Sequence, residues 1–265
     1  LDTRNGTGIS NGPIRIGDGS QTSTNPIFRA DDTANHDLQV TGVAGIPTSG
    51  VSAVLLNVTA VEPPTSGYIT VGPRPAGTGD VFNDQFTYGS WPNASNLNTQ
   101  PGQTVPNLVL ARVGAGGKIR LYNFNYPTHM VADVAGWFDT SALTSTSRGS
   151  SFFGVPPQRV LDTRNEIGEA SAVSGGKFAP LDSRSFTIAG VAGVPNNVES
   201  VVLNITAVSP TGTGWVTAYP DNTTRPDASN LNLNPGKDRS NLAVVKVGSN
   251  GKIRLFVAEA GTHLI

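Results

Sequence analysis

The sequence predicts an all-β protein made of two tandem, homologous β-sandwiches with Greek-key or jelly-roll-like wiring. Three observations support this prediction: most of the sequence occurs twice, short apolar segments alternate with turn residues, and glycine and proline are abundant. Of 265 residues, 31 are Gly and 19 are Pro, and only 14% are charged. This composition favours short strands joined by tight turns. We expect a first sandwich over residues 1–138, a linker over 139–150 and a second sandwich over 151–265.

The repeat begins with the first five residues, LDTRN, which return at 161–165. A single active site does not need to be built twice, so a duplication in register indicates repeated structural or binding units. The other matching segments are GVAGIP and GVAGVP at 42–47 and 190–195, LNVTA and LNITA at 56–60 and 203–207, ASNLN at 94–98 and 228–232, and GKIRL at 117–121 and 251–255.

Hydrophobic patterning predicts strands at matching positions in both repeats. Residues 200–208 begin with a continuous apolar run and then alternate, as in a central strand that is covered on both faces at one end. Shorter strands are expected at 38–41, 68–72 and 95–98, and at 186–189, 215–219 and 229–232.

A β-hairpin is predicted near the end of each repeat. Residues 242–247 and 252–257 flank the turn sequence GSNG, and the first repeat has the same arrangement around GAGG. In the second strand of each hairpin, Lys and Arg alternate with Ile and Leu, as in Lys118 and Arg120. We therefore expect this strand to have one wet face and one core face.

The closing segment differs between the repeats. The first repeat ends in VADVAGWF at 131–138, a strongly β-prone sequence, whereas Ile265 aligns with Val131. We therefore expect the second sandwich to lack its closing strand within the chain. Either the chain is a piece of a longer array, or copies complete each other, because an unpaired strand edge accepts a strand from another chain. The expected closing or assembly residues are Val131, Val134, Trp137, Phe138, Leu264 and Ile265.

Composition and charge argue against several functions. Lys and Arg number 18 against 19 Asp and Glu, so the net charge is −1, and the chain has no basic footprint for nucleic acid. The absence of Cys excludes disulfides, thiol catalysis and Cys-ligated metals. No stretch approaches the roughly 18 apolar residues of a membrane span.

The series LDTR, GVAGVP, LNVTA, ASNLN, GKIRLYN and HxxxDVAGWF resembles a repeat that recurs in secreted and cell-surface proteins of actinobacteria and related bacteria. The resemblance covers nearly the whole chain. It implies an exported, non-catalytic accessory or surface module, often appended to hydrolases or strung in arrays. The expected location is therefore extracellular. The resemblance brings no established ligand and no catalytic residues, so no enzyme activity is expected.

The repeated polar residues are expected to be structural. Asp2 and Arg4, and likewise Asp162 and Arg164, are two positions apart on a predicted strand and therefore on one face, where they can form ion pairs. His129 and His263 lack neighbouring ligands for a metal. The loop over 6–37 contains Asp18, Asp31, Asp32 and Asp37, but their spacing matches no calcium loop. We therefore expect no metal and no cofactor.

Two asparagine patterns recur. Asn57-Val58-Thr59 and Asn204-Ile205-Thr206 match the N-glycosylation pattern but lie in predicted core strands, where the polar side chains would satisfy backbone groups instead. Residues 95–98 and 229–232, both SNLN, place polar side chains at alternate positions. Such a row could hydrogen-bond sugar hydroxyls or form a ladder across strands.

An insertion distinguishes the first repeat. The offset between matching residues falls from 147 to 134 between Gly67 and Asn96, so the first repeat carries 13 extra residues. Rings in such a loop could stack on sugars, anchor a protein partner or fold back over the sandwich. The aromatic residues of this insertion are Phe82, Phe86, Tyr88 and Trp91.

These observations favour a secreted, non-enzymatic structural or adhesive repeat protein, in which strand complementation joins copies or adjacent repeats into a fibre or array. The principal alternative is a carbohydrate-binding module that targets a partner enzyme to cell wall or polysaccharide. A glycan hydrolase that uses an Asp pair is a third class, but the sequence offers no favoured pair.

Overall fold

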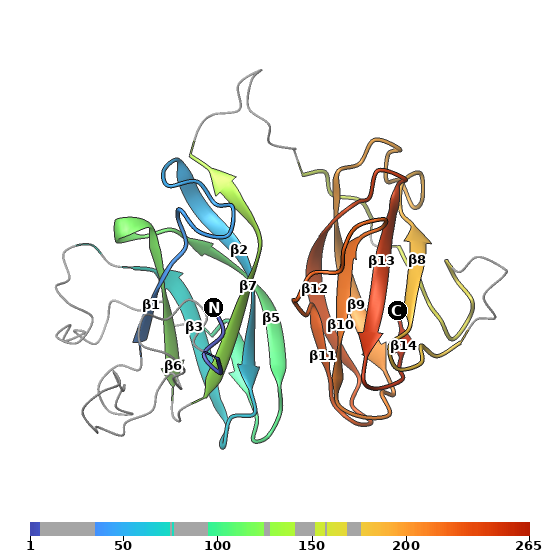
Figure 1. The fold of residues 1–265 in the computed structure, drawn as a ribbon, viewed down its shortest axis with the longest axis horizontal. Helices are drawn as coiled ribbons and strands as arrows, with labels where there is room; N and C mark the ends of the chain where they lie inside the picture. Colours follow the sequence, from blue (N-terminus) through green and yellow to red (C-terminus); the bar gives the residue numbers. More distant parts are fainter. Residues whose placement is uncertain are drawn as a thin grey trace. The chain divides into compact units, whose positions relative to one another are not determined.

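The computed structural model describes residues 1–5, 35–74, 76, 95–124, 128–140, 152–156, 158–168 and 176–265. The chain divides into two compact units, Leu1–Ser147 (unit 1) and Arg148–Ile265 (unit 2). Every regular element in the described residues is a β-strand, apart from one 3-10 turn at Ala115–Gly117 (Figure 1). The predicted all-β class is therefore confirmed. No helix in the described part is long and apolar enough to cross a membrane.

Unit 1 is a sandwich of two antiparallel sheets. One sheet has the strand order β1-β6-β3-β4 and the other has the order β5-β2-β7. Neighbouring strands are mostly not consecutive in sequence, as in Greek-key wiring. The bounds are β1 Asn35–Gln39, β2 Val51–Val61, β3 Gly67–Pro73, β4 Leu97–Thr99, β5 Val105–Arg112, β6 Lys118–Phe124 and β7 His129–Asp139.

Unit 2 repeats this plan. Its four-stranded sheet has the order β11-β10-β13-β8, and its three-stranded sheet has the order β12-β9-β14. Each strand takes the place of the unit 1 strand that matches it in sequence, for example β9 for β2 and β13 for β6. The bounds are β8 Ser183–Thr187, β9 Ser200–Val208, β10 Gly214–Pro220, β11 Leu231–Leu233, β12 Arg239–Lys246, β13 Lys252–Ala258 and β14 His263–Leu264.

Alternating side chains build one core in each unit. In β2, the side chains of Val54, Leu56, Val58 and Ala60 are all fully buried between the two sheets. In β9, Val201, Ile205 and Ala207 occupy the corresponding positions. Burial of such a face is the main driving force for pairing two sheets, and it sets which side of each strand points inward.

The predicted hairpin near the end of each repeat is wrong. β12 pairs with β9, whereas β13 pairs with β10 and β8, so the two strands belong to opposite sheets. β5 and β6 are divided in the same way. The turn does reverse the chain, and Gly251 supplies the positive φ that the reversal requires. Local turn chemistry does not determine which strand lies alongside, and here the connection crosses from one sheet to the other.

Candidate functional site

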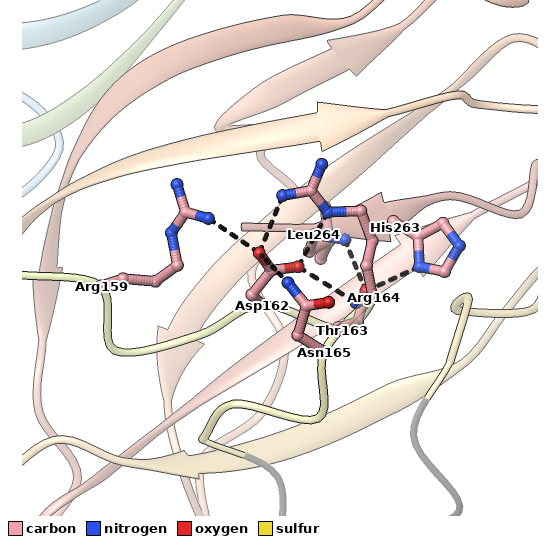
Figure 2. A network of polar contacts seen from close by, with 7 residues as sticks. All are labelled: Arg159, Asp162, Thr163, Arg164, Asn165, His263 and Leu264. Carbon is pink, nitrogen blue, oxygen red and sulfur yellow. Dashed lines mark hydrogen bonds and ion pairs between the residues drawn. The ribbon is translucent and has the colours of Figure 1, made fainter.

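The LDTR sequence forms a polar anchor at the start of each unit. In unit 2, Asp162 is fully buried and accepts hydrogen bonds from Arg164 Nε at 2.9 Å, Arg164 Nη2 at 2.8 Å and Arg159 Nη1 at 2.8 Å (Figure 2). In unit 1, Arg4 binds Asp2 through the same two nitrogens at 2.9 and 2.7 Å. The hydrogen bond from Arg164 holds the pKa of Asp162 well below its usual range, so this carboxylate stays ionised.

The threonine of the anchor ties the repeat's start to its end. Thr163 Oγ1 accepts the backbone N–H of Leu264 at 3.0 Å and lies 3.1 Å from His263 Nδ1 (Figure 2). Unit 1 has the same contacts between Thr3, Met130 and His129, at 2.8 and 3.2 Å. Each of these two histidines thus contacts the threonine of its own anchor. Among the described residues, no group of three His, Asp or Glu side chains could hold a metal ion.

A second polar cluster lies on the four-stranded sheet of unit 1. Asp37 in β1 binds Arg120 of β6 through both carboxylate oxygens and Arg74 Nε at 2.6 Å. The side chain of Arg120 is only 1% exposed, so the predicted wet face of β6 is wrong at this residue. Burial alone would raise the pKa of Asp37, but hydrogen bonds from Arg120 and Arg74 outweigh it and lower that pKa. Asp37 is therefore a structural counter-ion.

The SNLN asparagines mainly bind the backbone. Asn96 Oδ1 accepts the N–H of Val71 at 2.7 Å, and Asn230 Oδ1 accepts the N–H of Ala218 at the same distance. Each of the two backbone carbonyls accepts the side-chain amide of an asparagine on the other sheet, Asn107 or Asn241. This pair of contacts joins the two sheets at matching places, so these residues do not form the predicted ladder. Asn98 is exposed and has a different environment.

The edge of β9 is the feature that most distinguishes unit 2. In unit 1, β7 runs beside β2 from Val61 to Val51. In unit 2, β14 pairs only with Val208 and Ala207 of β9, and Ile265 exchanges two backbone hydrogen bonds with Thr206, at 2.8 and 2.9 Å. Within the described residues, no strand lies beside the rest of this edge, from Ser200 to Ile205.

The direction of the backbone groups along this edge follows from the register. The N–H and C=O of Thr206 both bond to Ile265, so those of Asn204 and Val202 point toward the same side, because direction alternates along a strand. The intervening residues face β12, as the bond from Val247 N–H to the Glu199 carbonyl shows. The edge thus presents a row of backbone donors and acceptors.

Side chains along the open β9 edge are more exposed than their counterparts in β2. Leu56 in β2 lies opposite Val134 of β7 and is 1% exposed, whereas its counterpart Leu203 is half-buried. Asn57 lies opposite Asp133 and is 4% exposed, whereas its counterpart Asn204 is exposed. The β9 edge therefore leaves both an apolar and a polar side chain of a central strand partly open to solvent.

The remaining predicted site residues are distributed as follows. Val131, Val134, Trp137 and Phe138 lie in β7, where the last three are partly exposed. Leu264 is fully buried in the core of unit 2. The aromatic insertion residues and the three remaining loop carboxylates lie outside the described residues, namely Phe82, Phe86, Tyr88, Trp91, Asp18, Asp31 and Asp32.

Comparisons with known proteins add little. No protein-family model and no curated protein matches this sequence. Among solved structures, the chain is similar to the N-terminal CBM22-1–CBM22-2 tandem domain of Paenibacillus barcinonensis Xyn10C, with 13% identity over 86% of this chain and 80% of that one. The TM-score is 0.24, which is too low for any functional conclusion.

Proposed function

We propose that this chain is a non-enzymatic structural or adhesive repeat protein whose second sandwich binds, along β9, an extended strand from another repeat of the same kind. The observation that carries this proposal is the unpaired β9 edge in the described residues, beside a half-buried core leucine. Strand addition to such an edge gives affinity through main-chain hydrogen bonds and specificity through the alternate side chains.

The template for the incoming strand is the outer half of β7. In the unit 1 register, Ala132 lies opposite Val58, Val134 opposite Leu56 and Trp137 opposite Val54. Transferred to unit 2, a strand with this pattern would cover Leu203 with an aliphatic side chain and place an aromatic ring next to Val201. Burial of these apolar groups would stabilise the complex by about 25 cal/mol for each Å² removed from water.

The other sheet edges differ from the β9 edge. β5 in unit 1 and β12 in unit 2 are outer strands of the three-stranded sheets. In β5 the exposed Leu110 is followed two positions later by the exposed Arg112, and in β12 the exposed residues are Ser240, Leu242 and Lys246. A charged edge discourages pairing with another chain. β9 instead matches β2 of unit 1, an apolar central strand that is paired on both sides.

The polar clusters support a non-catalytic role. Arg164 and Arg254 contact carboxylates whose pKa values are lowered, so these carboxylates cannot serve as general acids near neutral pH. We also propose that the protein acts outside the cell as a building block, with other repeats as its partners, as the resemblance of its sequence to secreted and cell-surface repeats implies.

A synthetic peptide tests the proposal on the intact chain. The peptide ADVAGWFD copies residues 132–139 and should bind when it is titrated with the protein and followed by fluorescence anisotropy. Amide exchange of Val202 and Asn204, measured by NMR, should slow on binding because these N–H groups face the open edge.

Two proline variants provide a matched pair. Asn204→Pro removes a donor that faces the open edge and should weaken peptide binding at least about tenfold, which is about 1.4 kcal/mol. Leu242→Pro makes the same change at the opposite edge of the same sheet and should leave binding unchanged. The proposal fails if the peptide does not bind, or if both variants bind it as well as the wild type does.

A further inference from the structure

An aromatic pair lies on the outer face of the four-stranded sheet of unit 1. Tyr68 in β3 and Phe124 in β6 are opposite each other in register, with ring centroids 4.8 Å apart and planes tilted by only 13°. Tyr122 lies one row further along, with its ring centroid 6.1 Å from that of Tyr68. Phe124 is 47% exposed, and neither it nor Tyr68 belongs to the core of the sandwich.

An exposed amide continues this row. Asn98 in β4 lies opposite Tyr68 on the other side of β3, so Asn98, Tyr68 and Phe124 form one line across three strands. Asn98 is exposed, unlike Asn96, which binds the backbone. The line carries no charged side chain. It combines an aromatic surface with an amide that can both donate and accept hydrogen bonds.

Unit 2 repeats the aromatic and the amide at the matching positions. Trp215 in β10 lies opposite Asn232 in β11. Ala258 replaces Phe124, and the adjacent Phe256 is covered by the guanidinium of Arg225 at 3.9 Å from the ring centroid. The aromatic–amide pair is thus present in both units although its surroundings differ. Within this row, Phe124 and Asn98 are more exposed than their counterparts Ala258 and Asn232.

We propose that Asn98, Tyr68 and Phe124 form a binding site for an uncharged polysaccharide. The apolar face of a pyranose ring can stack on the exposed ring of Phe124, and the Asn98 amide and the Tyr68 hydroxyl can bind sugar hydroxyls. A line across three strands suits an extended chain of linked sugars. This site lies on the four-stranded sheet of unit 1, whereas the open β9 edge belongs to the three-stranded sheet of unit 2. The site is therefore independent of the proposed assembly function.

Isothermal titration of the full chain with cellohexaose and with xylohexaose tests the site. We expect at least one of these neutral oligosaccharides to bind, and Phe124→Ala and Asn98→Ala each to weaken that binding by about tenfold or more. Leu110→Ala, which removes an exposed apolar side chain from the other sheet, is the matched control and should bind like the wild type. Circular dichroism of each variant checks that the fold is retained.

Two results would overturn the proposal. One is the absence of binding by either oligosaccharide at millimolar concentration, which would leave the exposed rings as a contact for a protein partner. The other is binding that Phe124→Ala and Asn98→Ala do not change but Trp91→Ala abolishes, which would assign recognition to the aromatic insertion. Neither result bears on peptide binding at β9, so the two proposals can fail separately.

Discussion

Unit 1 and unit 2 keep an arginine at the same position, but the carboxylate that pairs with it comes from a different part of each unit. Arg120 in β6 and Arg254 in β13 match in sequence. In unit 1 the carboxylate is Asp37 of β1, whereas in unit 2 the β1 position holds Ser185 and the carboxylate is Asp221, which matches Arg74. Ser185, Asn250 and Arg254 all donate to Asp221 at 2.7–2.8 Å. The arginine is paired with a carboxylate in both units although that carboxylate comes from different positions, which indicates a structural cluster rather than a ligand site.

The two clusters differ in how strongly they depend on their carboxylate. The side chain of Arg120 is 1% exposed, whereas that of Arg254 is 33% exposed and can be hydrated. Burial would raise the pKa of Asp221, but the hydrogen bonds from Asn250, Ser185 and Arg254 lower it to about 2. The same fold thus accommodates this cluster both with a buried arginine and with a partly solvent-exposed one.

The largest expected effect comes from Asp37→Asn. This change removes the carboxylate charge of Asp37 from beside the buried Arg120 guanidinium and should destabilise unit 1 by about 3–5 kcal/mol. Asp221→Asn should cost unit 2 less, about 1–3 kcal/mol, because Arg254 is more exposed. Urea unfolding followed by peptide-resolved hydrogen exchange reports β6 and β13 separately. Equal losses in the two units would contradict this account.

The change in the position of the carboxylate can itself be tested. The double substitution Asp37→Ser and Arg74→Asp writes the unit 2 arrangement into unit 1. If the geometry of the cluster is shared, this variant should regain at least about half of the stability that Asp37→Asn loses. The same urea and hydrogen-exchange measurement applies, and Asp37→Ser alone is the control. A double variant no more stable than that control would show that the two clusters are not equivalent.

The next largest expected difference between the two units is the pH dependence of their stability. Burial lowers the pKa of His36 in β1 from 6.5 to about 4, and the matching residue in unit 2 is Arg184. In the unfolded chain His36 is protonated near pH 6.5, whereas in the folded chain it stays neutral until the pH is near 4. The free energy of unfolding of unit 1 is therefore highest above pH 6.5 and falls as the pH is lowered toward 4. The loss should reach roughly 3 kcal/mol.

His36→Gln isolates this contribution. The variant should remove most of the loss that unit 1 shows between pH 7 and pH 4, as judged from urea midpoints of the β6 peptides. Unit 2 should lose some stability in the same direction, because burial also lowers the pKa of His263. An unchanged pH profile in the variant would exclude His36 as the source.

The smallest effect concerns the anchor that both units share. Thr3→Val and Thr163→Val each remove an acceptor for a buried backbone N–H, that of Met130 or of Leu264. Each change should cost about 1–3 kcal/mol at most, and the two losses should be similar because the contacts match. Thermal unfolding of the two variants measures this, and a clear difference would show that the anchors are not equivalent.

Sequence reasoning was reliable where neighbours along the chain determine structure. The duplication, the alternation in β2 and β9 and the turn residues were sufficient to predict an all-β fold with strands at matching positions. The pairs Asp2–Arg4 and Asp162–Arg164 do form, but in turns and not on the predicted strand, and the backbone N–H of each Arg binds the carboxylate two residues before it. The row of Asn98, Tyr68 and Phe124 was not recognised as a unit, because its members come from three strands.

Tertiary structure decided the features that depend on which strands lie side by side. The turn before β13 looks like a hairpin, but burial of both strands' apolar faces places them in opposite sheets. Arg120 and Asp37 are far apart in sequence and meet only because β6 pairs with β1. The repeat itself determined that two similar units exist. Only the packed structure determined that the same position is dry in one unit and partly wet in the other, because burial is a property of the assembled sheets and not of the local sequence.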